Sequence, residues 1–277
     1  MNTKSSSIEP GAGSRIRTPH SERAFTMIEI AVSLAIIGFA LVAIIGVLPI
    51  GMNVQKDNRE ETIINQDSTV FMNAIRSGSM GLDDLTNYVM AITNSVTKYD
   101  QNQKVVGTWR DWYTTTSSSV SPTYPLTNAF RIVGLLSIPK YVRWTNPGKG
   151  GGTGIISNNV VAYVRSMSGP SNEKFPQDNQ AVKDFAFSYR MTSEVVPYWT
   201  NYFDPAWVNA SNTATVNTLQ ANLCDLRLIF RWPLRSNGQL GPGSQSFRTL
   251  VGGQLLATND YGQLLYLFQP STYVKAQ

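Results

Sequence analysis

The pattern of apolar and polar positions near the N-terminus predicts a membrane-spanning helix. Residues 1–24 are polar, contain several Pro, Gly and Ser, and show no apolar periodicity. From Ile30 to Gln55 the chain has no charged residue, and Ile30–Leu48 is apolar on every side of a helix. At about 1.5 Å per residue this stretch forms a helix of about 28 Å, close to the roughly 30 Å hydrocarbon core of a bilayer.

A second pattern follows between residues 53 and 76, where apolar residues recur at helical spacing among charged and amide side chains. We expect this amphipathic segment to pack on a globular head and to end in the Gly- and Ser-containing stretch 77–81. Pro49 lies between the two patterns. Either the helix ends there as the chain leaves the bilayer, or Pro49 marks a bent section within one longer helix.

The remainder of the chain is expected to mix helix and strand. Apolar spacing predicts a short second helix over residues 83–96, with Asp83 and Asp84 at its positive end. Alternating positions predict an antiparallel sheet, and a loop over residues 235–244 predicts a hairpin between its last two strands. The predicted class is α+β, with a long N-terminal helix packed on an antiparallel sheet. The predicted strands are 130–136, 141–144, 160–166, 182–192, 224–232 and 247–256.

Composition disfavours an enzyme. The 277 residues are 42% hydrophobic and 15% charged, with a formal net charge of +5. Cys224 is the one cysteine and His20 the one histidine, and His20 lies in the polar N-terminal stretch. No catalytic residue, cofactor site or metal site is predicted, because disulfide, Cys-based zinc and buried-histidine chemistry all lack their residues. Arg190, Arg227 and Arg231 are interpreted as a solvated sheet face, so no nucleic acid partner is predicted.

The charges around the apolar stretch predict its orientation. Basic residues precede it, so the positive-inside rule keeps the N-terminus in the cytoplasm and carries the head across the membrane. A secretory signal peptide is the alternative, but its apolar region is shorter and Leu48-Pro49-Ile50 is a poor cleavage site. Glu29 at the mouth of the stretch needs either water in the headgroup region or a charged partner.

Here the residues resemble a family. Ala24 followed by Phe25-Thr26-Met27-Ile28-Glu29-Ile30 and about 20 apolar residues resembles the prepilin-type cleavage and methylation motif of type IV pilins and type II secretion pseudopilins. The segment 46–52 further resembles a prepilin-type subfamily called Verru_Chthon cassette protein B. Ala24 departs from the family pattern, which has Gly before the cleavage point.

The resemblance implies a role for each of these residues. A prepilin peptidase would cut between Ala24 and Phe25, and Phe25 would be N-methylated. In an assembled filament, the new α-ammonium of Phe25 would neutralise the Glu29 carboxylate among apolar helices. The implied division is a cytoplasmic leader (1–24), an N-terminal helix (25–76, transmembrane 25–48 and amphipathic 53–76) and a periplasmic α+β head (77–277).

The function implied by the resemblance is structural. The protein would be a minor pilin or pseudopilin, anchored by one span in the inner membrane, which assembles with other subunits into a type IV pilus or a type II secretion-like filament. The alternative is a single-pass envelope protein that does not assemble and whose head binds a ligand or polysaccharide. Other candidate sites are weaker. The Gly-rich stretch 148–154 is interpreted as a hairpin loop and the six tryptophans as core residues. Asp178 and Asp204 lack the dense ligand spacing of a calcium site.

Overall fold

The chain forms two compact units, residues 1–56 and 57–277. A computed structural model describes residues 25–78, 83–115, 123–145, 152–168, 187–198, 213–260 and 262–275. In chain order, the elements are α1 (Met27–Ser77), η1 (Asp83–Asn87), β1 (Val89–Asp100), β2 (Val105–Thr114), β3 (Thr123–Pro125), α2 (Ala129–Leu136), β4 (Tyr141–Thr145), β5 (Thr153–Arg165), β6 (Ser188–Pro197), α4 (Thr213–Asn222), β7 (Leu223–Leu234), β8 (Leu240–Gly252), β9 (Gln254–Asp260) and β10 (Gln263–Gln269).

The N-terminal helix α1 is continuous over 51 residues, and Pro49 lies inside it. The prediction of a long apolar N-terminal helix is confirmed, and the alternative that the helix ends at Pro49 is wrong. Proline removes one internal hydrogen bond, but the bonds of the turns on either side remain. The apolar window of α1 is not buried in the protein, and α1 is the one helix in the described ranges that is long and apolar enough to cross a membrane.

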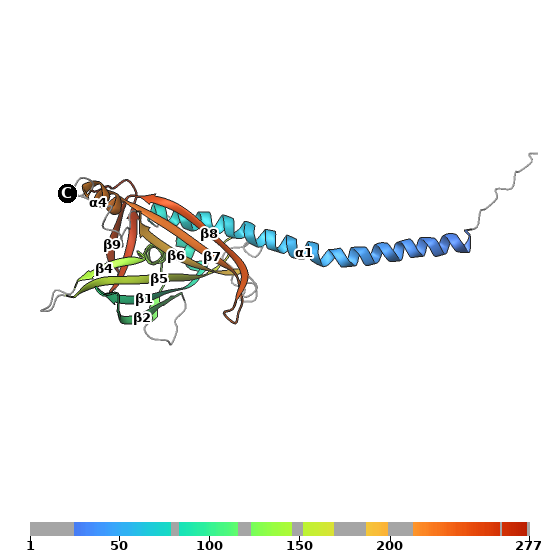
Figure 1. The fold of residues 1–277 in the computed structure, drawn as a ribbon, viewed down its shortest axis with the longest axis horizontal. Helices are drawn as coiled ribbons and strands as arrows, with labels where there is room; N and C mark the ends of the chain where they lie inside the picture. The colour runs from blue at the N-terminus through green and yellow to red at the C-terminus, as the bar shows by residue number, and fades with distance from the viewer. Residues whose placement is uncertain are drawn as a thin grey trace, which may run out of the picture. The chain divides into compact units, whose positions relative to one another are not determined.

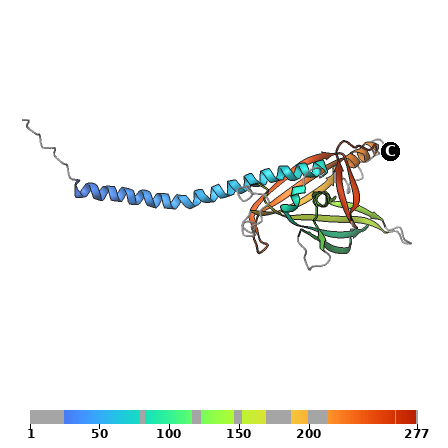
Figure 2. The same ribbon diagram turned by 180° about the vertical axis from the view of Figure 1, so that it is seen from behind.

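The head is built on an eight-stranded sheet. Its strands lie side by side in both views of the ribbon (Figure 1, Figure 2). The strand order is β3-β2-β1-β5-β6-β7-β8, and β4 pairs with the beginning of β5. All pairs in this sheet are antiparallel except β2–β3. A separate two-stranded hairpin is formed by β9 and β10. The predicted α+β class with an antiparallel sheet is confirmed.

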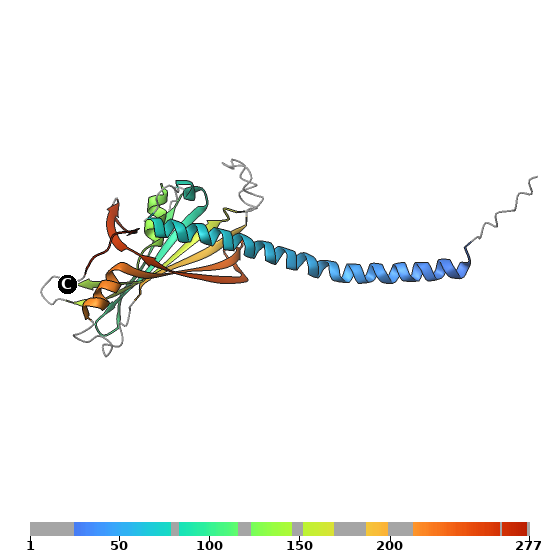
Figure 3. The same ribbon diagram turned by 90° about the horizontal axis from the view of Figure 1, so that it is seen from above.

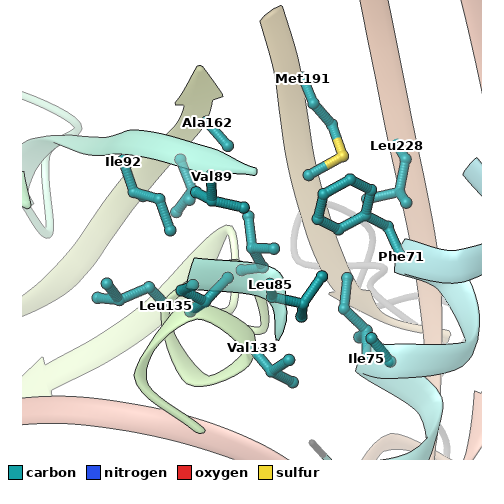
Figure 4. Close-up of a cluster of buried hydrophobic side chains, with 14 of the residues drawn as sticks. Phe71, Ile75, Leu85, Val89, Ile92, Val133, Leu135, Ala162, Met191 and Leu228 are labelled. Atoms are coloured by element: carbon teal, nitrogen blue, oxygen red, sulfur yellow. The ribbon is translucent and has the colours of Figure 1, made fainter. Parts of the chain in front are cut away.

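The C-terminal half of α1 lies along the sheet (Figure 3) and supplies part of the hydrophobic core. Phe71 of α1 points toward Met191 of β6 and Leu228 of β7, and Ile75 of α1 lies near Leu85 (Figure 4). Phe71, Met191 and Leu228 are fully buried, and so is Ile75. Side chains of η1, α2, β1 and β5 complete the same cluster, among them Leu85, Val89, Ile92, Val133, Leu135 and Ala162. The predicted amphipathic half of the helix therefore packs on the head, and it does so through its apolar stripe.

Two sequence predictions of secondary structure are wrong. Residues 83–96 form the 3₁₀ helix η1 and the first half of β1, because the β-branched residues of this segment fit a strand between two partners. Residues 130–136 form α2, whose N-cap Asn128 accepts a hydrogen bond from the Arg131 amide at 2.9 Å. Within α2, Ala129, Ile132 and Val133 are buried at helical spacing.

The remaining predicted strands are found with shifted bounds. Strands β4 and β7 match the predicted segments closely, whereas β5 begins at Thr153, well before the predicted start at Val160, and ends at Arg165. Residues 182–186 of the predicted strand 182–192 lie outside the described ranges. The predicted strand 247–256 is divided between β8 and β9 by Gly253, whose φ of +116° interrupts the extended backbone. The predicted hairpin between β7 and β8 is confirmed, but its turn is short because β8 already begins at Leu240.

Candidate functional site: the first turn of the N-terminal helix

The first turn of α1 is closed by a reciprocal set of hydrogen bonds. The Thr26 amide and the Thr26 hydroxyl each donate to Oε2 of Glu29, both at 2.9 Å, and the Glu29 amide donates to Oγ1 of Thr26 at 3.3 Å. Thr26 is the residue before the helix and Glu29 is the third residue inside it, so the pair forms a capping box. Two amide groups that the helix itself leaves without partners are satisfied in this way.

This cap holds the Glu29 carboxylate beside the backbone of the residue that follows Phe25. Phe25 itself is 81% exposed, and the apolar side chains of the first helical turns are exposed as well. Ala24 lies outside the described residues. The structure therefore brings Glu29 close to the main chain at Thr26, one residue from the predicted cleavage point, on a helix whose apolar surface has no protein cover.

A second feature of α1 is a buried carboxylate that the sequence analysis did not predict. Asp67 is fully buried among the head's strands. Its two oxygens accept hydrogen bonds from the Met167 amide (3.0 Å), the Ser168 amide (3.1 Å), the Ser168 hydroxyl (2.7 Å) and the Tyr189 hydroxyl (2.9 Å). We name Asp67 with Met167, Ser168 and Tyr189 the Asp67 cluster. It ties α1 to the chain just after β5 and to β6.

Burial dominates the electrostatics of the Asp67 cluster. Loss of water raises the pKa of Asp67 above its ordinary value, although the four accepted hydrogen bonds oppose that rise. Burial and the neighbouring Asp67 carboxylate raise the pKa of Tyr189 well above its ordinary value, so its hydroxyl stays a proton donor. The only feature of the sequence that could have indicated this buried carboxylate was the position of Asp67 beside the apolar stripe of an amphipathic helix. A charged side chain at such a position is normally solvated.

The other candidate residues are scattered through the head. Among the described tryptophans, Trp232 is buried and Trp109 and Trp112 are exposed, while Trp199 and Trp207 lie outside the described residues. One face of the Trp144 ring is covered by the Lys98 ammonium, 3.6 Å from the ring centroid. Cys224 is buried, and burial raises the pKa of its thiol to about 12, as expected of a small core residue.

Two further predictions concern loops. The Gly-rich stretch 148–154 connects the antiparallel strands β4 and β5, which confirms a hairpin connection, and residues 148–151 themselves lie outside the described ranges. Asp178 and Asp204 also lie outside them. Within the described residues, no group of three or more His, Cys, Asp or Glu side chains is placed to hold a metal ion.

Comparison with known proteins finds one similarity, and it falls on the capped helix start. Residues 19–45 match the prokaryotic N-terminal methylation motif. This match covers Ala24, Phe25 and Glu29 and most of the apolar half of α1. No curated protein and no solved structure matches the chain.

The fold and the motif together define the class of protein that this chain resembles. A long apolar N-terminal helix packed on an antiparallel sheet, with the methylation motif at its start, is similar to type IV pilins and pseudopilins. This similarity points to a structural protein that is anchored in a membrane by a single helix.

Proposed function

We propose that the protein is a structural subunit, a minor pilin or pseudopilin, that assembles through α1 into a type IV pilus or a type II secretion-like filament. The methylation motif over residues 19–45 carries the proposal, because it coincides with a helix whose apolar surface is exposed. Such a surface needs either lipid or neighbouring apolar helices. We place the subunit in the inner membrane with a cytoplasmic N-terminus and a periplasmic head. The stretch 46–52 supports, within this class, the Verru_Chthon cassette protein B subfamily.

The proposed maturation begins with hydrolysis of the Ala24–Phe25 peptide bond by a prepilin peptidase. Hydrolysis leaves an α-ammonium group on Phe25, which is then N-methylated. The Thr26–Glu29 cap supports the next step, because it holds the Glu29 carboxylate within one residue of this new cation. In a filament, the Phe25 ammonium would neutralise a Glu29 carboxylate among the packed apolar helices, so each buried charge has a partner.

The first test is the N-terminal sequence and mass of the protein isolated from native membranes. Cleavage predicts a chain that begins at Phe25, with the mass of residues 25–277 plus one methyl group. A chain that begins at Met1 overturns the proposed maturation, and one that begins near Asn53 indicates an ordinary signal peptide.

A second test separates the charge of Glu29 from its capping role. Glu29→Gln keeps an acceptor for the Thr26 amide but loses the charge, whereas Thr26→Ala removes the threonine hydroxyl from the cap and keeps the charge. Filament incorporation should be lost in Glu29→Gln and kept in Thr26→Ala. Glu61→Ala, an exposed carboxylate on the same helix, is the matched control and should assemble normally. Normal incorporation of Glu29→Gln would refute the charge-pairing step.

A further inference from the structure

The face of the eight-stranded sheet opposite the hydrophobic core is strongly basic. Cross-strand register assigns seven arginines to this face, against two acidic strand residues, Glu194 and Asp225. We call this surface the open face and define it by its arginines and three of its large aromatic side chains. These are Arg110, Trp112, Tyr141, Arg143, Tyr163, Arg165, Arg190, Arg227, Arg231 and Arg248.

The register places two pairs of arginines directly opposite each other. Arg227 of β7 faces Arg248 of β8, and Arg190 of β6 faces Arg231 of β7. Like charges at directly opposite positions of an antiparallel pair destabilise a sheet. A fold keeps such a pair at a cost unless an anion lies between or beside the guanidinium groups.

The Arg227–Arg248 pair is neutralised by carboxylates of the same chain. Arg248 donates from Nε to both oxygens of Asp225 at 2.8 Å, and its Nη2 lies 2.6 Å from Oδ2 of Asp225. Arg227 lies 3.8 Å from Glu194, which also binds Lys140 at 2.7 Å. The Arg227–Arg248 pair is therefore neutralised from its own face of the sheet.

The second pair has no such anion among the described residues. No ion pair of Arg190 or Arg231 is found there, and Nε of Arg190 is buried without a hydrogen-bond acceptor. Nε of Arg165, on the neighbouring strand β5, is in the same state. Three adjacent arginines thus carry positive charge at one place on the open face, without an ion-pair partner among the described residues.

The surroundings of this place indicate the chemistry of a partner. Trp112 and Tyr163 stack with ring centroids 6.1 Å apart, and Trp112 and Tyr141 remain 38% and 37% exposed. Between the arginines the open face carries short hydroxyl and amide side chains, such as Asn159, Thr192 and Ser246, together with the apolar Val161 and Ile229. Aromatic faces contact the apolar side of sugar rings, hydroxyl and amide groups exchange hydrogen bonds with sugar hydroxyls, and guanidinium groups bind carboxylates.

We propose that the open face binds an acidic polysaccharide, with its carboxylates at Arg190, Arg231 and Arg165 and its sugar rings along Trp112, Tyr163 and Tyr141. The breadth of the face suits a polymer rather than a small molecule, since the arginines extend from β2 to β8. Single-stranded nucleic acid is less well matched, because the described residues of β6, β7 and β8 on this face, where the paired arginines lie, include no aromatic side chain for base stacking. This proposal does not depend on filament assembly.

The test is binding of the full-length chain in detergent micelles to immobilised polygalacturonate, with neutral dextran and a poly-dT oligonucleotide as comparison probes. We expect binding to polygalacturonate that weakens as salt is raised, and no binding to dextran. The double variant Arg190→Gln/Arg231→Gln should lose at least about tenfold in affinity. The matched control Arg227→Gln/Arg248→Gln, which removes the neutralised pair, should change affinity by less than about threefold.

Each other outcome overturns the proposal. Equal losses in the two double variants would show a response to total charge and not to the Arg190–Arg231 pair. Tighter binding to poly-dT than to polygalacturonate would identify a nucleic acid surface, and equal binding to dextran would show that the arginines are not used. Absence of binding to polygalacturonate would refute the proposal, provided that thermal unfolding shows the chain to be folded. Arg190→Gln/Arg231→Gln should itself unfold no earlier than the parent protein, because it removes a repulsion.

Discussion

Replacement of Asp67 tests whether its buried carboxylate fastens α1 to the head. In Asp67→Asn one carboxylate oxygen becomes an NH₂ group, which cannot accept a hydrogen bond. If the amide stands where Oδ2 was, the Tyr189 hydroxyl can turn to accept, but the Met167 amide loses its acceptor. If it stands where Oδ1 was, the Ser168 amide loses its acceptor in the same way. Either orientation takes the Asp67 acceptor away from one half-buried N–H group.

The magnitude follows from that count. An unsatisfied buried amide costs about 1–3 kcal/mol, so Asp67→Asn should lower the free energy of unfolding by about 2 kcal/mol. For a unit of this size that corresponds to a fall in Tm of about 4–8 °C. Asp67→Ala removes the carboxylate that both amides donate to and should cost about 3–5 kcal/mol. Tyr189→Phe removes one of four donors, leaves no amide unsatisfied, and should cost about 1 kcal/mol.

The assay is thermal and denaturant unfolding of the full-length chain in detergent, followed by near-UV circular dichroism of the head's aromatic residues. Asp57→Asn, an exposed carboxylate on the same helix, is the matched control and should change stability by no more than about 0.5 kcal/mol. The reasoning fails if Asp67→Asn unfolds with the parent protein, or if Tyr189→Phe is as destabilised as Asp67→Ala.

Three further predictions concern single groups of the head. Because burial raises the pKa of Asp67 above 3.8, the stability that its proton linkage contributes should be full below pH 3.8 and lost as pH rises through the folded-state pKa. The stability difference between the parent protein and Asp67→Asn should therefore narrow from pH 3 upward, and a widening gap in denaturant titrations would contradict the direction of the shift. Cys224, with a pKa of about 12, should resist iodoacetamide at pH 8 in the folded protein and react in urea, and fast labelling under native conditions would show that its strand opens. Asn128→Ala removes the cap acceptor of α2 and should cost about 1 kcal/mol, measured by denaturant unfolding, whereas Asn128→Asp should retain most of that stability.

The sequence correctly predicted the elements that have a sustained periodic pattern or an extreme composition. The apolar helix is one example, and the alternation of Leu226, Leu228 and Phe230 in β7 is another, with all three side chains buried as expected. The predictions of a helix over residues 83–96 and of a strand over residues 130–136 were wrong, because short apolar runs fit the period of a helix as well as that of a strand. In the first, pairing with β2 and β5 decides for a strand, and in the second the Asn128 cap decides for a helix.

The candidate sites likewise divide into one that local spacing predicts and others that depend on distant parts of the chain. Thr26 and Glu29 are three residues apart, so their relation is visible in the sequence. The partners of Asp67 are 100 residues or more away in the chain, and the opposition of Arg190 and Arg231 exists only once β6 and β7 have found their register. Local spacing in the sequence cannot predict the Asp67 contacts or the Arg190–Arg231 pair, because each depends on which strands become neighbours.

The position of Asp67 also has a consequence for the order in which the chain acquires its structure. The helix is made first, yet its apolar stripe and its buried carboxylate are covered by elements made much later: Tyr189 follows Asp67 by 122 residues. During synthesis the C-terminal half of α1 must therefore wait with Phe71 and Ile75 uncovered until β6 and β7 arrive. Contacts of such long range form slowly and leave apolar surface open to wrong partners. Until the sheet closes over it, this half-helix therefore exposes an apolar stripe that can make wrong contacts.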